Sequence, residues 1–357
     1  MLKKLLTLST VYYYQYLGFD KKLIFSKKKE IIFISIVENS KIMLSKTELI
    51  EEIKRLKEEK NAVILAHYYT IGDIQDIADF VGDSLALAQK AAKSTADIIV
   101  MCGVHFMGET CKILCPEKKV LVPDLEAGCS LADSCPAEDF GKFVKDHPGY
   151  TVLSYVNTTA AVKYYTDIVV TSGNALKIVD SLPKDEKIIF GPDRNLGNYI
   201  NVVTGREMLL WDGACHVHER FSTEAILKLK AEHPNAKVLV HPECKRPVAL
   251  LADKIGSTAV LLKFAVEDEC TEFIVATESG ILHEMMKQAP EKTFIPVPPE
   301  VSEGSIGCSC NECAYMRLNT LEKLYACLKD ETPEINVDPA IIERAKLPID
   351  RMLELSK

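Results

Sequence analysis

Short runs of apolar residues recur along this chain of 357 residues at a nearly constant interval. Three of these runs end in a polar residue that is followed two positions later by another, within residues 63–69, 152–157 and 238–243, and the runs are 88 and 86 residues apart. A cluster of glycine, serine or threonine follows each run and opens a helical pattern, at residues 82–84, 171–173 and 256–258. Self-similarity at a fixed period indicates a repeated architecture.

Each repeat contains two further apolar runs. The second runs lie at residues 98–101, 188–190 and 273–276, and the third at residues 120–122, 208–211 and 293–297. Apolar runs of this length between helical segments are typical of parallel strands that are buried on both faces. The pattern therefore predicts an α/β fold of three homologous αβα domains with parallel sheets.

We place the three αβα repeats at residues 43–130, 131–216 and 217–357, the last with a cysteine-bearing loop and helices at its C-terminal end. A repeat of roughly 90 residues is small for an independent domain, because a short chain buries a small fraction of its surface. We therefore expect the three repeats to pack together.

The first 42 residues have a different composition, rich in Lys, Tyr, Ile and Phe. Their only apolar run, residues 31–37, is too short to span a bilayer. The segment also lacks a clear signal-peptide cleavage site and contains no Arg, unlike a transit peptide. We expect it to be dispensable, and we expect an amphipathic helix at residues 44–60 with Ser45 or Thr47 as its cap.

The net charge and the cysteine content indicate which partners and which cellular compartment to expect. The formal net charge is −8 and the sequence pI is near 5.6, which leaves no basic stripe for a nucleic-acid backbone. Twelve cysteines without the spacing of a disulfide framework favour a reducing compartment and thiolate ligation. We expect a cytoplasmic protein with no nucleic-acid or membrane partner.

Three cysteines, Cys129, Cys215 and Cys313, fall at the same place in the three repeats, after the third apolar run and a glycine-rich stretch. Structural zinc prefers four protein ligands, often as two close pairs, and this chain has only the pair Cys310 and Cys313. A [4Fe–4S] cluster on three cysteines leaves one iron open to act as a Lewis acid. The repeat pattern identifies Cys129 and Cys215 more firmly than Cys313, because Cys308 and Cys310 lie close to Cys313.

The other cysteines have a simpler interpretation, because a free cysteine is usually a small buried hydrophobic residue. We expect that role for Cys102, Cys111, Cys115, Cys244, Cys270 and Cys327, and leave Cys135 open.

Polar pairs stand at the ends of the first strands: His67 with Tyr69, Tyr155 with Asn157, and His241 with Glu243. Ligands of parallel α/β sheets bind beyond the carboxyl ends of the strands, so three domains meeting at one axis would direct these pairs into one cavity. Hydroxyls at the helix starts would add anion sites, at Ser84, Ser172, Ser257 and Thr258. Any one of these residues alone is more often a simple helix cap or a structural residue.

The chain resembles the quinolinate synthase family over roughly residues 44–355. The shared motifs are AHYY at 66–69, GDSLA at 82–86, CGVHFMGET at 102–110, DLEAGCS at 124–130, SYVNT at 154–158, GPDRNLG at 191–197, HPEC at 241–244 and CAYM at 313–316. The resemblance implies an A-type enzyme of NAD biosynthesis, a transferase that condenses iminoaspartate with dihydroxyacetone phosphate to form quinolinate, phosphate and water. It also implies three αβα domains around a pseudo-threefold axis and a [4Fe–4S] cluster.

Carried over to this chain, the family's cluster ligands match Cys129, Cys215 and Cys313, the last because it precedes Met316 by three residues. Members of the family often have Cys-x2-Cys-x2-Cys here, whereas this chain has Cys308-x-Cys310-x2-Cys313. The family's substrate-binding residues match His67, Tyr69, Ser84, Tyr155, Asn157, Ser172, His218, His241, Glu243, Ser257 and Thr258. His218 ranks above its neighbour His216. An aspartate-oxidising enzyme is the implied supplier of iminoaspartate.

The chemistry of the implied reaction assigns roles. Tyr69, His241 and Glu243 are the candidates for acid–base catalysis, because carbon–carbon bond formation and loss of water require proton transfers. Two other functions stay open from the residues: a [4Fe–4S] hydro-lyase of another small hydroxy acid, and a non-enzymatic iron–sulfur carrier.

Overall fold

The computed structural model describes residues 44–300 and 311–357 of the chain. The predicted 1–42 extension, Cys308 and Cys310 therefore lie outside the described residues. The chain divides into two units, of which the second, Leu49–Lys357, contains all the described strands. At the start of helix α3 (Lys46–Glu59), Ser45 and Glu48 form a reciprocal capping box, with Ser45 N donating to Glu48 Oε2 at 2.7 Å. Of the two predicted caps, Ser45 and Thr47, Ser45 is therefore the one that caps α3.

The three repeats form three parallel sheets of four strands each, and all three sheets have the same strand order. In the first sheet the order is β2-β1-β3-β4. Its strands are β1 (Ala62–His67), β2 (Phe80–Gly82), β3 (Ile98–Cys102) and β4 (Lys119–Leu121), and its helices are α4 (Gly72–Ile77), α5 (Ser84–Ala92), α6 (His105–Leu114) and α7 (Ser130–Asp133).

The second sheet has the order β6-β5-β7-β8 and the third has the order β10-β9-β11-β12. The elements of the second repeat are α8 (Ala137–Lys145), β5 (Thr151–Tyr155), α9 (Ala160–Lys163), β6 (Ile168–Val170), α10 (Ala175–Ser181), β7 (Ile188–Gly191), α11 (Arg194–Thr204) and β8 (Leu209–Leu210). Those of the third are η1 (His218–Arg220), α12 (Thr223–Glu232), β9 (Lys237–Val240), α13 (Arg246–Ala249), β10 (Lys254–Ile255), α14 (Thr258–Glu267), β11 (Glu272–Ala276), α15 (Ile281–Gln288) and β12 (Thr293–Pro296).

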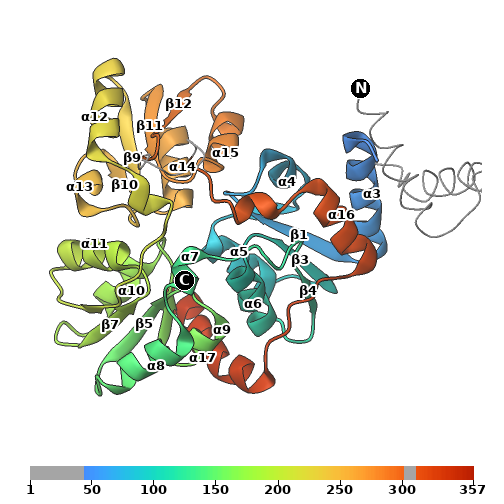
Figure 1. Ribbon diagram of the computed structural model, residues 1–357, viewed down its shortest axis with the longest axis horizontal. Helices are drawn as coiled ribbons and strands as arrows, with labels where there is room; N and C mark the ends of the chain where they lie inside the picture. The colour runs from blue at the N-terminus through green and yellow to red at the C-terminus, as the bar shows by residue number, and fades with distance from the viewer. Residues whose placement is uncertain (1–43, 301–310) are drawn as a thin grey trace, which may run out of the picture. The chain divides into compact units, whose positions relative to one another are not determined.

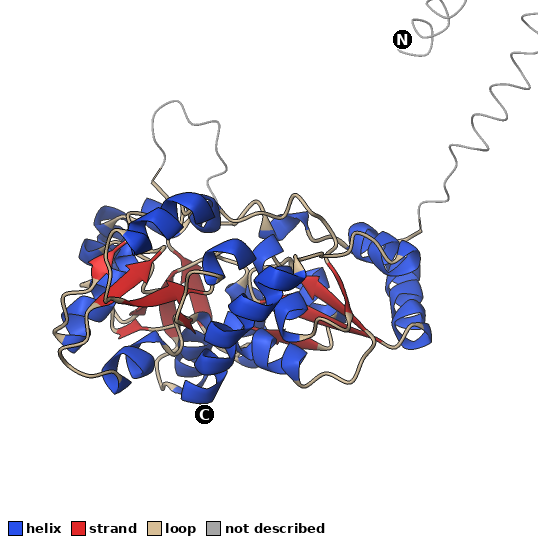
Figure 2. Ribbon diagram, turned by 90° about the horizontal axis from the view of Figure 1, so that it is seen from below, coloured by secondary structure: helices blue, strands red, loops and turns tan. Residues whose placement is uncertain are grey.

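The predicted α/β class is confirmed, and the sequence pattern missed one strand in each repeat. The missed strands β2, β6 and β10 are two or three residues long and form an edge of each sheet. Central strands β3 and β7 are buried at every residue, because helices cover both faces of the sheets. Figure 2 shows the strands between layers of helices. The three sheets form three lobes around one centre (Figure 1).

The C-terminal segment returns from the third repeat to the other two. It contains η2 (Met316–Leu318), α16 (Leu321–Asp330) and α17 (Pro339–Leu355). Helix α17 packs against β6 and α9 of the second repeat and against α6 of the first. Asn319, just before α16, donates from Nδ2 to Gly103 O at 2.9 Å, at the end of β3. This segment therefore ties the repeats together, as the red helices in Figure 1 show.

Among the described residues, no helix combines the length and apolar character needed to cross a membrane.

Candidate active site

One pocket lies where the three repeats meet, at the carboxyl ends of the central strands. In each sheet the chain leaves the first strand (β1, β5 or β9) toward the edge strand on one side (β2, β6 or β10). It then returns to the central strand on the other side (β3, β7 or β11), so a crevice opens between the two central strands. Residues of all three repeats line the pocket, among them His67, Tyr69, Ser84, Cys129, Tyr155, Asn157, Ser172, Cys215, His218, His241, Glu243, Thr258 and Cys313.

The three predicted ligand cysteines occupy equivalent local structures. Each carbonyl oxygen accepts a hydrogen bond from the amide four residues later: Cys129 from Asp133 at 2.9 Å, Cys215 from Glu219 at 3.0 Å and Cys313 from Arg317 at 3.2 Å. Each cysteine thus begins a helical turn, at α7, η1 and η2. All three side chains are partly exposed and line the pocket, and all described cysteines are free thiols.

The sulfur atoms also share one pattern of donors. Burial raises the pKa of all three thiols, that of Cys129 to about 12, and the backbone amides two and three residues later act in the opposite direction at each cysteine. These amides belong to Leu131 and Ala132, to Val217 and His218, and to Tyr315 and Met316. Amides directed at sulfur stabilise thiolates, so each turn is suited to hold a metal-bound cysteine.

His67 and Tyr69 stand together at the end of β1. The amide of Tyr69 donates to His67 Nδ1 at 3.2 Å, and the two rings pack edge to face with centroids 4.6 Å apart. Burial lowers the pKa of His67 to about 4. The Tyr69 hydroxyl lies 3.0 Å from Thr258 Oγ1 and 2.8 Å from Thr277 Oγ1, and burial raises its pKa well above the usual value. Tyr69 is therefore a protonated donor near neutral pH.

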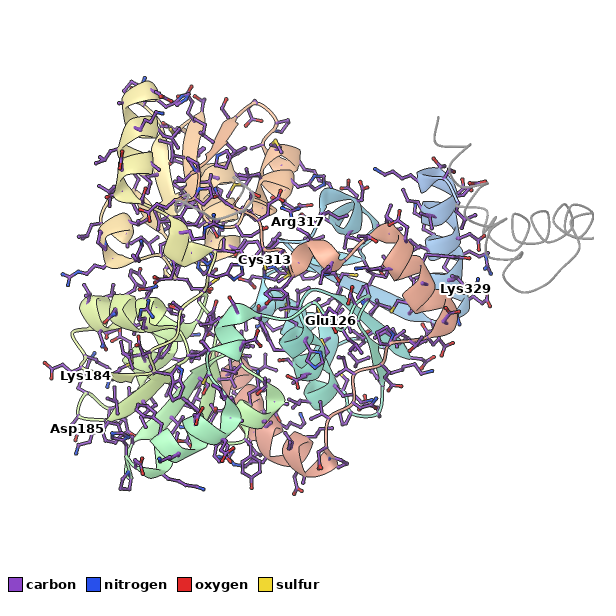
Figure 3. The ribbon with its side chains drawn as sticks, viewed as in Figure 1. Glu126, Lys184, Asp185, Cys313, Arg317 and Lys329 are labelled. Atoms are coloured by element: carbon purple, nitrogen blue, oxygen red, sulfur yellow. The ribbon has the colours of Figure 1, made fainter. Side chains whose placement is uncertain are left out.

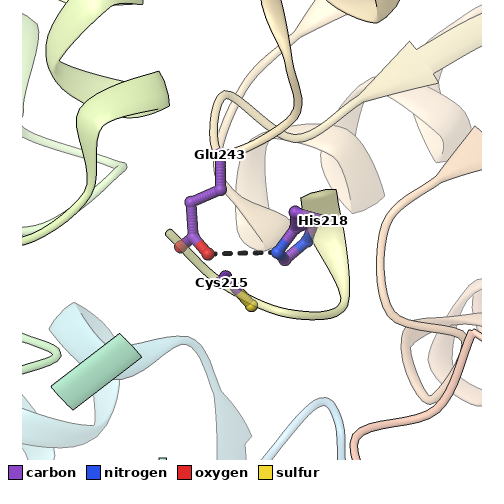
Figure 4. A group of neighbouring side chains, drawn as sticks. All are labelled: Cys215, His218 and Glu243. Carbon is purple, nitrogen blue, oxygen red and sulfur yellow. Dashed lines mark ion pairs between the residues drawn. The ribbon is translucent and has the colours of Figure 1, made fainter. Parts of the chain in front are cut away.

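Glu243 is the centre of a buried polar cluster. Its Oε1 accepts a hydrogen bond from the Tyr155 hydroxyl at 2.5 Å, and its Oε2 lies 3.0 Å from His218 Nδ1 (Figure 4). Burial alone would raise the pKa of Glu243, but His218, His241 and the Tyr155 hydrogen bond lower it. Glu243 is therefore an anion. Its carboxylate, His218 and Cys215 present three ligand atoms within 4.8 Å of one another.

The His241 ring stacks on the His218 ring, with centroids 4.7 Å apart, and its Nδ1 lies 3.8 Å from Glu243 Oε1. Burial lowers the pKa of His241 to about 3. His218 Nε2 lies 3.0 Å from Thr277 Oγ1. Burial thus keeps His241 unprotonated at neutral pH.

The predicted hydroxyl residues divide into two kinds. Ser84 and Thr258 are the first helical residues of α5 and α14, and both line the pocket. Ser172 also lines the pocket, but it lies in a turn before α10 rather than at the helix start. Ser257 is outside the pocket lining, and its hydroxyl accepts from Val260 N as the cap of α14. Ser257 is therefore observed as a helix cap, and its predicted contact with substrate stays a prediction.

Asn157 Oδ1 is buried and has no hydrogen-bond partner among the described residues. A buried polar atom without a partner is costly, so a ligand in the pocket is its natural partner. His216 also lines the pocket, but its Nδ1 lies 2.5 Å from Ser130 Oγ, away from Glu243. The ranking of His218 above His216 stays a prediction, since both histidines line the pocket.

Sequence reasoning missed several residues of the pocket. Asp83 and Glu278 line the pocket, and Thr277 Oγ1 lies 2.8 Å from the Tyr69 hydroxyl. Thr277 and Glu278 directly follow the second apolar run of the third repeat, which is the signal that marks them, whereas Asp83 follows the short edge strand β2, which the apolar pattern does not predict. Among the cysteines expected to be buried, Cys270 is instead partly exposed, because it lies in the turn before β11; Cys135 is buried.

Comparison with known proteins decides the family. Residues 51–354 match the family described as Quinolinate synthetase A protein. A quinolinate synthase of Microcystis aeruginosa is 56% identical over 309 residues, which are 87% of this chain and 95% of that protein. The quinolinate synthase of Chloroherpeton thalassium is 54% identical over 321 residues, 90% of this chain and 98% of that protein. The chain belongs to the quinolinate synthase family. It is therefore an enzyme, and the resemblance seen in its motifs is confirmed.

The pocket brings together most of the residues that quinolinate synthase motifs single out in this chain. Every predicted site residue except Ser257 lines it, and the three cysteines come from three separate repeats. Family membership and pocket geometry thus point to the same part of the molecule.

Proposed function

We propose that this enzyme condenses iminoaspartate with dihydroxyacetone phosphate to form quinolinate, phosphate and water, as a cytoplasmic step of NAD biosynthesis. The observation that carries the proposal is the convergence of three equivalent cysteine turns and three strand-end pairs on one pocket, in a chain of the quinolinate synthase family. An aspartate-oxidising enzyme is the proposed source of iminoaspartate.

A [4Fe–4S] cluster fits the donor set that Cys129, Cys215 and Cys313 present. Three sulfurs, each facing two backbone amides, match a cluster that keeps one iron without a protein thiolate. When bound, the cluster supplies a Lewis-acidic iron that can polarise a substrate oxygen or nitrogen. Cys129, Cys215 and Cys313 would hold this cluster in the same pocket that the strand-end residues line.

Anion binding is assigned to the helix starts. Iminoaspartate carries two carboxylates and the triose carries a phosphate, and the N-terminus of a helix presents free N–H groups and a positive dipole end. The hydroxyls of Ser84 and Thr258 stand at the starts of α5 and α14, where the caps Asp83 and Ser257 already accept from Ala86 N and Val260 N, and Ser172 adds a third hydroxyl. Asn157 Oδ1 is available to accept a hydrogen bond from the imine or a hydroxyl of the substrate.

Proton transfer is assigned to the buried cluster around Glu243. The Glu243 carboxylate and the neutral His241 imidazole can each accept a proton from carbon beside a carbonyl. Tyr69, held protonated by burial, can donate to a leaving hydroxyl, and Thr258 and Thr277 fix the direction of its hydroxyl. His67 and Tyr155 orient these groups, and His218 holds the carboxylate.

The experiment is anaerobic purification, a count of iron and acid-labile sulfide, and an assay for quinolinate and inorganic phosphate from the two substrates. We expect about four irons and four sulfides per chain, the content of one such cluster. A single metal ion without sulfide would instead favour a mononuclear site on Cys215, His218 and Glu243. Quinolinate formation without release of phosphate would contradict the proposed reaction.

A further inference from the structure

Two buried carboxylates occupy equivalent positions in the second and third repeats. Strand pairing aligns Gly191, the last residue of β7, with Ser154 of β5, and Ala276, the last residue of β11, with Val240 of β9. These partners each directly precede a strand-end pair, at Tyr155 and His241. The carboxylates Asp193 and Glu278 therefore both stand two residues beyond the matching strand end, and both are almost fully buried.

Glu278 holds the main chain of a proposed cluster ligand. Its Oε1 accepts a hydrogen bond from the backbone amide of Cys313 at 3.0 Å. Its Oε2 accepts from the amide of Gly280 at 2.6 Å, so both oxygens are engaged by backbone groups. The side chain is 1% exposed and also lines the pocket. Glu278 thus connects the end of β11 to the cysteine turn.

Arg317 is the last residue of the turn that begins at Cys313, and it also contacts Glu278. Its Nη2 lies 3.3 Å from Glu278 Oε1 and 3.4 Å from Ser279 Oγ, and its backbone amide donates to Cys313 O at 3.2 Å. A second carboxylate, that of Glu312, lies 3.3 Å from the same nitrogen. Cys313 and Arg317 lie together near the centre of the molecule in Figure 3. The buried carboxylate therefore binds both the first and the last residue of the turn.

Asp193 occupies the matching position in the second repeat but is bonded differently. Its Oδ1 accepts from Leu196 N at 2.7 Å as the cap of α11, and its Oδ2 has no hydrogen-bond partner among the described residues. The first repeat differs, since Val104 stands at the matching position after β3. There the neighbouring amide of His105 donates to the carbonyl of Ala127, two residues before Cys129, at 2.7 Å.

Cys313 follows a longer connection from its sheet than Cys129 and Cys215 do. Cys313 comes 17 residues after the end of β12, whereas Cys129 and Cys215 come 8 and 5 residues after β4 and β8. Fixing the end of a longer connection costs more conformational entropy. A buried carboxylate that accepts the Cys313 amide offsets part of that cost.

We propose that Glu278 is a positioning residue for the cluster: with Arg317, it fixes the Cys313 turn so that the sulfur is held at the third ligand position. This inference rests on the proposed [4Fe–4S] cluster and adds a residue outside its ligands. Groups that orient metal ligands typically change metal affinity 10–100-fold when they are replaced.

The test compares Glu278→Gln with Glu284→Gln after anaerobic reconstitution. Glu284 is a buried carboxylate of the same repeat that bonds to Lys287 and Gln288 on its own helix, and it is therefore a matched control. Gln keeps the volume of Glu278 but replaces one acceptor oxygen with an NH2 group, which cannot accept from the amides of Cys313 or Gly280. We expect the cluster of Glu278→Gln to be lost to a chelator about tenfold faster than that of wild type, and that of Glu284→Gln at the wild-type rate.

Urea unfolding and a second variant, Arg317→Gln, distinguish a positioning role of Glu278 from a general effect on folding. The urea midpoint of the cluster-free proteins should differ little between the two variants, which separates positioning from a general loss of stability. If Glu278→Gln does not fold, Arg317→Gln takes its place and should show severalfold faster cluster loss. Wild-type loss rates in the folded variant would overturn the inference alone, whereas a wild-type protein without iron and sulfide would overturn the proposed function.

Discussion

At the scale of single residues, the proposed function divides the pocket into cysteines that would hold the cluster and side chains that would transfer protons. The cysteines stand on loops that follow the fourth strands, whereas Tyr69, His241 and Glu243 stand at the ends of β1 and β9 or directly after them. Glu243 lies near both groups, since its carboxylate, Cys215 and His218 present ligand atoms within 4.8 Å of one another. Substitutions at the two groups should therefore have different consequences.

Replacing each of Cys129, Cys215 and Cys313 with Ala should abolish the cluster, because a three-cysteine cluster has no thiolate to spare. Cys308→Ala and Cys310→Ala, whose positions lie outside the described residues, should each leave it assembled. Iron and sulfide counts after anaerobic purification measure this. A Cys313→Ala protein with a full complement of iron would show that another cysteine is the ligand.

Glu243→Gln should leave the cluster content and absorption spectrum unchanged while turnover falls about 10²-fold or more, the usual scale for loss of a positioned acid or base. Tyr69→Phe should behave in the same way, because it removes the hydroxyl between Thr258 and Thr277 and keeps the ring. Steady-state rates of quinolinate formation measure the loss. Loss of iron in both variants would instead make these residues part of the metal site.

Acid should weaken the fold through His67. Its pKa is about 4 in the folded chain, below the ordinary value of 6.5, so the unfolded chain binds a proton more readily between these values. The stability is fully present above pH 6.5 and falls as the pH drops toward 4, by on the order of 3 kcal/mol for this one group. His67→Gln should show a smaller difference in urea midpoint between pH 7.5 and pH 5 than wild type. An equal difference would contradict the assignment.

At the scale of elements, long buried strands could be predicted and short edge strands could not. β1, β3 and β5 contain enough consecutive apolar residues to be recognised, whereas β10 has two residues and gives no pattern. The strand-end pairs could be predicted because they recur at one place in the three repeats, directly after the first apolar run. Asp193 and Glu278 could not, because Val104 occupies the matching position of the first repeat, so no polar residue recurs there.

The turn after β5 depends on a buried lysine. Lys163 is fully buried in α9, and its amine donates to Val156 O at 2.9 Å and to Thr158, on either side of Asn157. Lys163→Met would leave these carbonyls without a donor, at a cost of about 1–3 kcal/mol in unfolding free energy. Because Asn157 lies between them, KM should rise as well. The exposed Lys142→Met is the control, and unchanged values in both variants would contradict this role.

At the scale of the whole molecule, a chain that begins at Met43 should fold, hold its cluster and turn over normally. The described strands, the pocket and all three ligand cysteines lie after that residue. Solubility, iron content and turnover of the truncated chain measure this against the full chain. Loss of cluster on truncation would show that the first 42 residues support the fold.

The return of the C-terminal segment to the first two repeats has a consequence for biosynthesis. Cys313 precedes α16 and α17, and these helices close the first and second repeats after the third sheet has been made. Translation therefore delivers the last proposed ligand, and then the two helices that cover the first and second repeats, after the rest of the fold has been made. Under the proposed function, cluster loading can be completed only once Cys313 has been synthesised, and a chain truncated before Cys313 would lack one of the three proposed ligands.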